Sequence, residues 1–325
     1  MVDKDFRDDW ALPWFDSSLY TLGGKGALTG LEGVIDASVL RGGKRLRPLL
    51  MGEFARFFGL PFDAVIPYAR AAEQVHSATL AHDDVIDESS TRRGSLTLNA
   101  RIENRKAILA GDYLLAEGIY AVSKLKNAAI VEGLAATLRE LVTGELLQNE
   151  ARGISDVSSS HLSRVADLKT ASLFRWCCLV PAHLSNAPEP VIALTREFAT
   201  RIGVAFQWID DAVDFSLSSG KPYAADLREG LVNRVTFRLL EIAPHTQAWV
   251  QRSLSSNSSE SLPWTPEEIQ SAVEDTRSAG RAQMGAARRN LSDLISAMTH
   301  AGQAPSQESS QRIERILQRL EERLL

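Results

Sequence analysis

Two acidic clusters in this chain share one pattern, Asp-Asp-x-x-Asp, and each lies inside an otherwise apolar, helix-like stretch. Together they contain Asp83, Asp84, Asp87, Asp210, Asp211 and Asp214. On a helix, residues four positions apart share a face, so the first and last aspartates of each cluster can point the same way. Two such pairs facing across a cavity would repel one another unless hard cations joined them. Because Mg²⁺ takes one or two protein carboxylates and completes its shell with water and phosphate oxygens, the clusters predict diphosphate chemistry.

Basic and polar side chains before the first cluster have the chemistry to bind phosphate oxygens. Residues 41–48 read Arg-Gly-Gly-Lys-Arg-Leu-Arg-Pro. The glycines let the backbone approach a ligand closely, and Lys44 and Arg47 share a helical face. A solvated basic turn is the alternative explanation of this segment. His76 lies two helical turns before Asp83 on the same face, where it could donate to a phosphate.

Further candidates follow the first cluster. Arg92 and Arg93 lie five and six residues after Asp87, and either a diphosphate or a simple ion pair with an aspartate would explain them. A Gly-Glu-x-x-Gln pattern at 144–148 favours polar packing between helices. The remaining candidates are Lys169, Thr170, Gln207 and Lys221. Each of these residues alone is explained by structure, but their joint occurrence in this order indicates a diphosphate site.

The elements that would position these groups are helices. Helical periodicity is clearest at Ala107–Lys126, Ala129–Asn149 and Pro190–Leu217, and alternating strand patterns are scarce. A capping box at Thr265 and Glu268 predicts the start of another helix. We therefore predict one all-α domain over residues 1–325, with a motif-bearing core at about 31–250 and divergent segments at both ends.

Composition limits the compartment and the kinds of partner. The chain has 325 residues, 44% of them hydrophobic, and its net charge of −5 gives no general attraction to nucleic acid. The two cysteines, Cys177 and Cys178, are adjacent and belong to no metal-binding pattern, which favours a reducing compartment. The first residues lack the apolar core of a signal peptide, and no run of about 20 apolar residues predicts a membrane span. We expect a cytoplasmic protein that binds no nucleic acid.

The motifs and their order resemble those of the trans-isoprenyl (polyprenyl) diphosphate synthases. The likeness is strongest to the members that make long chains, such as octaprenyl and decaprenyl diphosphate. It is carried by segments that follow the family's order from the first basic segment to the loop after the second cluster. They are Gly42–Pro48, Glu73–Gly94, Gly111–Gly118, Gly144–Gln148, Lys169–Phe174, Gly203–Asp214 and Gly220–Gly230.

The resemblance implies an isoprenoid-synthase fold, which is a single-domain helix bundle around a deep central cavity, in a homodimer. It implies a prenyltransferase that joins isopentenyl diphosphate to an allylic diphosphate such as farnesyl or geranylgeranyl diphosphate. The allylic diphosphate ionises, the double bond of isopentenyl diphosphate attacks the allylic cation, and loss of a proton leaves a new trans double bond. The implied cofactor is Mg²⁺, about three ions per active site, for which Mn²⁺ can substitute.

By motif position, the resemblance also assigns roles to individual residues. The six aspartates hold the metal ions, with Asp83, Asp87 and Asp210 as the main ligands. The residues implied at the allylic diphosphate are Arg92, Lys169, Thr170, Gln207 and Lys221. The residues implied at isopentenyl diphosphate are Lys44, Arg47, His76 and Arg93.

The chain departs from the family's pattern beside the second cluster. After Gly230 the family has a lysine of the allylic site, whereas this chain has Leu231, and Arg234 stands out of register with that lysine. Trp208 replaces a small aliphatic residue next to Gln207. These departures concern turnover and loop closure more than the metal site.

The length of the product should depend on the helical turn before the first cluster. Ala78 and Thr79 precede Asp83 by about one turn, and an aromatic side chain there would block a growing chain. Because both residues are small, we predict a long product of about C30–C50, by analogy with the family. So apolar a product favours peripheral contact with a membrane for its release, although the sequence shows no anchor.

Two other functions remain open from the sequence. A class I terpene cyclase is also all-α with an acidic motif, but it carries a different second motif and needs no isopentenyl diphosphate site. A subunit of a heteromeric prenyl synthase is the other alternative, since the lysine is missing and the ends diverge. Such subunits commonly lose their aspartates, whereas this chain keeps all six.

Overall fold

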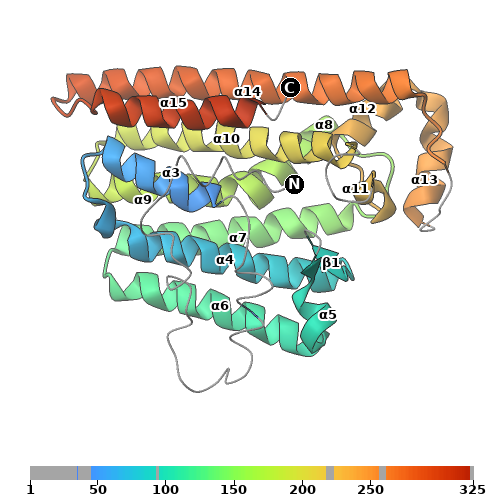
Figure 1. Ribbon diagram of the computed structural model, residues 1–325, viewed down its shortest axis with the longest axis horizontal. Helices are drawn as coiled ribbons and strands as arrows, with labels where there is room; N and C mark the ends of the chain where they lie inside the picture. Colours follow the sequence, from blue (N-terminus) through green and yellow to red (C-terminus); the bar gives the residue numbers. More distant parts are fainter. Residues whose placement is uncertain (1–34, 36–44, 93–94, 217–222, 256–260, 323–325) are drawn as a thin grey trace. The chain divides into compact units, whose positions relative to one another are not determined.

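The computed structural model describes residues 35, 45–92, 95–216, 223–255 and 261–322 (Figure 1). Over these residues the regular structure is helical except for one short hairpin, in which β1 (Thr91–Arg92) pairs antiparallel with β2 (Ser95–Leu96). The predicted all-α fold class is therefore confirmed. The single domain and its central cavity stay predictions.

The chain divides into two compact units. The first unit comprises Met1–Gly52 and Phe62–Val131, and the second comprises Glu53–Pro61 and Glu132–Leu325. Helices α3 (Leu46–Phe57) and α7 (Ala128–Glu150) each contribute residues to both units. Each acidic cluster belongs to a different unit, so each is described within its own unit.

The first unit is built on two long helices, α4 (Ile66–Ile86) and α6 (Asn104–Lys124), which pack along one another. Small side chains such as Ala78, Ala81 and Ala107 fill the contact and let the helices approach closely. The shorter elements of this unit are η3 (Phe62–Ala64), β1, β2 and α5 (Leu98–Ile102).

The second unit contains the longest helices of the described chain. α10 (Glu189–Asp214) packs along α14 (Pro266–His300), and α15 (Gln307–Glu322) lies beside α14 (Figure 1). The other elements are α8 (Ser159–Val165), the π-helical turn η4 (Ala166–Ala171), α9 (Ser172–Leu184), α11 (Ala225–Arg228), α12 (Arg234–Ile242), η5 (Pro244–Thr246) and α13 (Gln247–Ser255).

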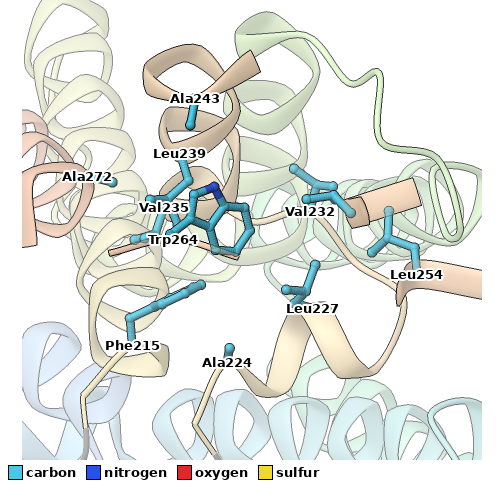
Figure 2. Packing of buried hydrophobic residues seen from close by; sticks show 11 residues of the cluster. Phe215, Ala224, Leu227, Val232, Val235, Leu239, Ala243, Leu254, Trp264 and Ala272 are labelled. Atoms are coloured by element: carbon cyan, nitrogen blue, oxygen red, sulfur yellow. The ribbon is translucent and has the colours of Figure 1, made fainter. Parts of the chain in front are cut away.

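Buried hydrophobic side chains hold the segments that follow the second acidic cluster. In Figure 2 the Trp264 indole lies among side chains of α12, including Val235 and Leu239, with Phe215 at the end of α10. Its ring nitrogen donates to the hydroxyl of Thr246 at 3.1 Å, which satisfies the polar end of this buried aromatic side chain. This cluster anchors the chain on both sides of α11.

The sequence predictions of individual helices agree closely with the structure. The three clearest periodic stretches correspond to α6, α7 and α10, with ends shifted by a few residues. The capping box is present, since the Thr265 hydroxyl accepts from Glu268 N at 3.2 Å and Glu268 Oε2 accepts from Thr265 N at 2.8 Å. Among the described residues, no helix is both long and apolar enough to cross a lipid bilayer.

Candidate functional site

Each acidic cluster lies in the last turn of a long helix. α4 ends at Ile86 with Asp87 as its C-cap, and α10 ends at Asp214. The C-terminal end of a helix carries partial negative charge on its unpaired carbonyl groups, so carboxylates are unfavourable there and cations are favoured. Two helices that both end in three aspartates therefore present sites whose electrostatics call for positive charge.

In the first cluster, Asp83 and Asp87 differ from Asp84 in their surroundings. Asp83 and Asp87 are partly exposed, whereas Asp84 is only 1% exposed. The buried Asp84 carboxylate forms an ion pair with Arg92, with 2.7 Å between Oδ1 and Nε. The partly exposed pair is therefore better placed than Asp84 to meet a cation from solution.

The hairpin that carries Arg92 is held against the end of α4 by hydrogen bonds. The side-chain amide of Asn99 donates to the carbonyl of Asp84 at 3.2 Å and to that of Ser89 at 3.1 Å. The Thr97 hydroxyl donates to the same Ser89 carbonyl at 2.8 Å. The simple ion pair considered for Arg92 from the sequence is thus present, and a role at a diphosphate stays a prediction.

The basic candidates around α3 and α4 are described only in part. Arg45 forms an ion pair with Glu73, which is 3% exposed, and so links the residue before α3 to α4. Arg47 and His76 are both partly exposed, as a role in binding phosphate oxygens requires. Three predicted site residues, Lys44, Arg93 and Lys221, lie outside the described residues.

His82, the residue before the first cluster, contacts α6. Its Nε2 lies 3.3 Å from Asp112 Oδ1 and 3.2 Å from the carbonyl oxygen of Ile108. A Cβ at Gly111 would overlap the imidazole ring, so the glycine of the Gly-Asp-Tyr-Leu-Leu segment makes room for it. His82 is therefore a packing residue between α4 and α6.

In the second cluster, the three aspartates are also used differently. Asp210 is partly exposed, whereas Asp211 is 7% and Asp214 is 2% exposed. Asp214 accepts hydrogen bonds from the backbone N of Ala225 at 3.0 Å and of Asp226 at 3.3 Å. Asp210 and Asp214 therefore differ in exposure although they share a helix face, because the first turn of α11 captures the Asp214 carboxylate.

Asp211 is held by neighbours on two elements. Its Oδ1 accepts from Gln207 Nε2 at 2.9 Å, and its Oδ2 accepts from the backbone N of Arg234 at 3.1 Å. Burial raises its pKa to about 7, with a further rise from the nearby Asp226 and Asp210 charges, and the two hydrogen bonds oppose this rise. A negative charge on Asp211, in addition to those of Asp210 and Asp226, is therefore unfavourable unless positive charge is close by.

A chain of hydrogen bonds joins the second cluster to the Lys169-Thr170 pair. The Thr170 hydroxyl lies 2.6 Å from Gln207 Oε1, and Gln207 in turn donates to Asp211. Lys169 Nζ lies 2.5 Å from Glu145 Oε2 and 2.8 Å from Gln148 Oε1. Three of the predicted allylic-site residues and one aspartate are thus brought together in the second unit.

The π-helical turn η4 carries Lys169 and Thr170 and is enclosed by two glycines. A Cβ at Gly144 of α7 would lie 2.5 Å from Lys169 N, and a Cβ at Gly203 of α10 would overlap Ala171. π-helical turns are uncommon and are found frequently at functional sites. The Gly-Glu-x-x-Gln pattern does pack helices together, as expected, and it also binds Lys169.

Gly203→Ala is expected to lower the free energy of unfolding by about 1–3 kcal/mol, because the methyl group would overlap the backbone of η4. The matched control is Gly285→Ala on α14, where the nearest atom to a new Cβ is Arg289 Nη1 at 3.8 Å. Gly285→Ala should instead be neutral or stabilise by up to about 1 kcal/mol, since alanine favours helices. Urea unfolding followed by circular dichroism measures both, and equal effects would contradict the close packing at Gly203.

The sequence interpretation missed residues that support the site. Arg175 is 9% exposed and pairs with Asp167 of η4 and with Glu140 of α7, where Nη2 and Oε2 are 2.7 Å apart. Asn233 Nδ2 donates to Asp226 Oδ2 at 2.9 Å and to Asp214 at 3.3 Å. Asp226 lies within the segment that resembles the family, so its position in the motif was the available signal.

The structure separates the two residues predicted to set product length. Ala78 is 1% exposed and packs with Ala81, Ala110 and Leu114 in the α4–α6 contact. Thr79 is partly exposed, lies four residues before Asp83, and donates to the His76 carbonyl at 2.9 Å. Thr79 therefore shares the helix face of Asp83, whereas Ala78 faces the core of the first unit.

Two relatives are similar to this chain in sequence. The decaprenyl-diphosphate synthase of Dictyostelium discoideum is 35% identical over 217 residues, which cover 66% of this chain and 47% of that protein. Component 2 of the heptaprenyl diphosphate synthase of Geobacillus stearothermophilus is 36% identical over 194 residues, covering 59% of this chain and 61% of that protein. The chain thus spans about half the length of the first of these relatives.

The fold comparison covers nearly the whole chain. The crystal structure of a decaprenyl diphosphate synthase from Rhodobacter capsulatus superimposes with a TM-score of 0.83, at 26% identity and with 99% of both chains covered. The model of the family described as polyprenyl synthetase matches residues 29–274. The matched range includes both acidic clusters and every predicted site residue, and the chain belongs to the polyprenyl synthetase family.

Proposed function

We propose that this chain is a trans-prenyltransferase that condenses isopentenyl diphosphate with an allylic diphosphate and makes an all-trans polyprenyl diphosphate of about C30–C50. The observation that carries the proposal is the pair of acidic clusters, each in the last turn of a long helix and each with a partly exposed aspartate. The decaprenyl synthase names of the relatives support the long product.

The donor chemistry of the clusters fits Mg²⁺ shared with a substrate. Asp83, Asp87 and Asp210 would be the main ligands, and Asp84, Asp211 and Asp214 would act close by or through water. Among the described residues, no three acidic, histidine or cysteine side chains form a ready cage for a metal. Mg²⁺ commonly binds one or two carboxylates and completes its shell with water and substrate phosphate, which one or two available aspartates per cluster can satisfy.

The chemistry requires the allylic carbon–oxygen bond to break with its electron pair leaving on diphosphate. Bound Mg²⁺, which we expect at about three ions per site with Mn²⁺ as a substitute, would neutralise the charge of that leaving group. Lys169 and Arg92 would stabilise the same oxygens, and Thr170 and Gln207 would orient them. The alkene carbon of isopentenyl diphosphate then bonds to the allylic carbon, and a proton leaves the adjacent carbon.

Isopentenyl diphosphate would be bound by a separate set of basic and polar side chains. Arg47 and His76 of the first unit belong to this set, together with Lys44 and Arg93. Lys221 is proposed for the allylic diphosphate. Because the two diphosphates are proposed to bind different side chains, substitution of one set of these side chains should change the KM for one substrate more than that for the other.

Incubation of the purified chain with Mg²⁺, farnesyl diphosphate and radiolabelled isopentenyl diphosphate tests the proposal directly. A ladder of labelled products ending at about C30–C50 on thin-layer chromatography is the expected result. Geranylgeranyl diphosphate in place of farnesyl diphosphate compares the two candidate primers. A cyclic hydrocarbon made without isopentenyl diphosphate would identify a terpene cyclase and overturn the proposal.

A heteromeric synthase is the second candidate. One relative is named as component 2 of a heptaprenyl diphosphate synthase, which supports this possibility for the present chain. Inactivity of the pure chain, followed by activity on addition of a second protein, would establish it. We otherwise propose a cytoplasmic homodimer that makes peripheral membrane contact when an apolar product leaves.

Thr79→Phe is expected to shorten the main product by several isoprene units, because Thr79 shares the helix face of Asp83 and is partly exposed. Thin-layer chromatography of the dephosphorylated products measures the change. Ala78→Phe is the matched variant, since it introduces the same ring into the packed α4–α6 contact. It should lower the free energy of unfolding by about 1–3 kcal/mol through overpacking. An unchanged product with Thr79→Phe would remove Thr79 from the account of chain length.

A further inference from the structure

Two residues that depart from the family's pattern contact each other in the second unit. The guanidinium carbon of Arg234 lies 4.3 Å from the centre of the Trp208 ring. A guanidinium over an indole is attracted to the negative face of the ring, and the attraction grows when water is excluded. Trp208 is 7% exposed, so the ring side of this contact is shielded from solvent, while Arg234 is partly exposed.

Small neighbours hold the Trp208 ring in place. Trp208 forms a buried cluster with Val204 of α10 and with Ala166 and Ala171 of η4, and Ala279 of α14 packs against this cluster. Alanines at these positions leave the volume that an indole needs, whereas larger residues would displace it. Trp208 therefore connects α10 to the π-helical turn that carries Lys169 and Thr170.

Arg234 is fixed at the start of α12. Asn233 is the N-cap of this helix, and its side-chain oxygen accepts from Thr236 N at 3.0 Å. The backbone N of Arg234 donates to Asp211, and Asn233 donates to Asp214. The start of α12 is thus bound to both buried aspartates of the second cluster.

The Trp208 ring is a described contact of the Arg234 guanidinium. Its Nε is buried without a hydrogen-bond partner among the described residues. Burial lowers the Arg234 pKa, the charge of Asp211 opposes this, and Arg238 lowers it further. The acids Asp275 and Glu241 lie in the same region but bind Arg238. We therefore take stacking on Trp208 as the contact that orients this guanidinium.

We propose that Trp208 and Arg234 form a positioning pair for the allylic site, an inference that rests on the proposed function. By holding the start of α12 against α10, the pair fixes Asp211 and, through Gln207, the Thr170 hydroxyl. Leu231 is a buried hydrocarbon side chain and offers no cation that a diphosphate could attract. In the proposal, the stacked pair rather than a cation at residue 231 holds the start of α12 in place, with or without substrate.

The pair should affect one substrate and not the other. Trp208→Leu and Arg234→Gln are each expected to raise the KM for the allylic diphosphate about five- to tenfold, the loss of one shielded cation–π contact. The KM for isopentenyl diphosphate should not change, because its proposed ligands are not on α10 or α12. Trp208→Phe keeps an aromatic face and should restore most of the affinity.

A double-mutant cycle and a control separate the pair from general loss of stability. The KM of the double variant Trp208→Leu/Arg234→Gln for the allylic diphosphate should be no higher than that of the more impaired single variant, since both substitutions remove the same interaction. Arg238→Gln removes ion pairs one turn further along α12 and should leave both KM values unchanged. Equal changes in both KM values, additive effects, or a Phe variant as poor as Leu would overturn the proposal.

A binding measurement separates this inference from the proposed function. Isothermal titration of inorganic diphosphate with Mg²⁺ into the wild-type chain and the same variants does not depend on turnover. About five- to tenfold weaker binding by Trp208→Leu and Arg234→Gln supports the positioning pair even where the wild type makes no product. Binding equal to that of the wild type would overturn it, whatever the activity.

Discussion

Asp83→Ala is expected to reduce product formation by more than about a thousandfold, because it removes a partly exposed carboxylate from the negative end of α4. The proposed reaction needs cations at this end of the helix to neutralise a departing diphosphate. The remaining Asp84 cannot replace it without giving up its ion pair with Arg92. Initial rates with radiolabelled isopentenyl diphosphate at saturating Mg²⁺ measure the loss.

The matched control is Asp293→Ala, which removes an exposed aspartate of α14 that belongs to neither cluster. This variant should keep full activity, and circular dichroism should show that both variants are folded. Product formation by Asp83→Ala at more than a few per cent of the wild-type rate would contradict the assignment of the first cluster as the metal site.

Asp214→Ala is expected to lower the free energy of unfolding by about 2–4 kcal/mol, since it leaves buried donors without an acceptor. The carboxylate accepts from the backbone N of Ala225 and Asp226 and from the side chain of Asn233. Its loss would release the start of α11 and lower activity indirectly. Asp214→Asn keeps one acceptor oxygen and should lose less stability.

Asp210→Ala provides the comparison within the same cluster. Asp210 is partly exposed, so water can solvate the groups around it when the carboxylate is removed. The loss of stability should therefore be smaller than for Asp214→Ala. Activity should nevertheless fall more steeply than stability, because Asp210 is the proposed metal ligand. Urea unfolding and initial rates on the same preparations distinguish the two roles. Equal losses of stability would show that the two aspartates are not used differently.

Local patterns explain why much of this protein could be predicted. Helical periodicity and the capping box at Thr265 depend on residues a few positions apart, and α6, α7, α10 and α14 form close to where these patterns predict them. The class of chemistry could also be predicted from the sequence, because acidic and basic residues at motif spacing favour metal ions and phosphate groups as ligands. Which aspartates are buried and which are partly exposed could not be predicted from the sequence, because it depends on partners brought from elsewhere in the chain.

The sequence by itself determined an all-α protein of the polyprenyl synthetase family with aspartates suited to Mg²⁺ and diphosphate. Tertiary structure alone decided which aspartates remain partly exposed, since Asp84 is captured by Arg92 and Asp214 by the backbone of α11. It also decided that Trp208 stacks on Arg234. Periodicity fixes which way a side chain points from its own helix, but burial and pairing depend on the segments that pack against that helix.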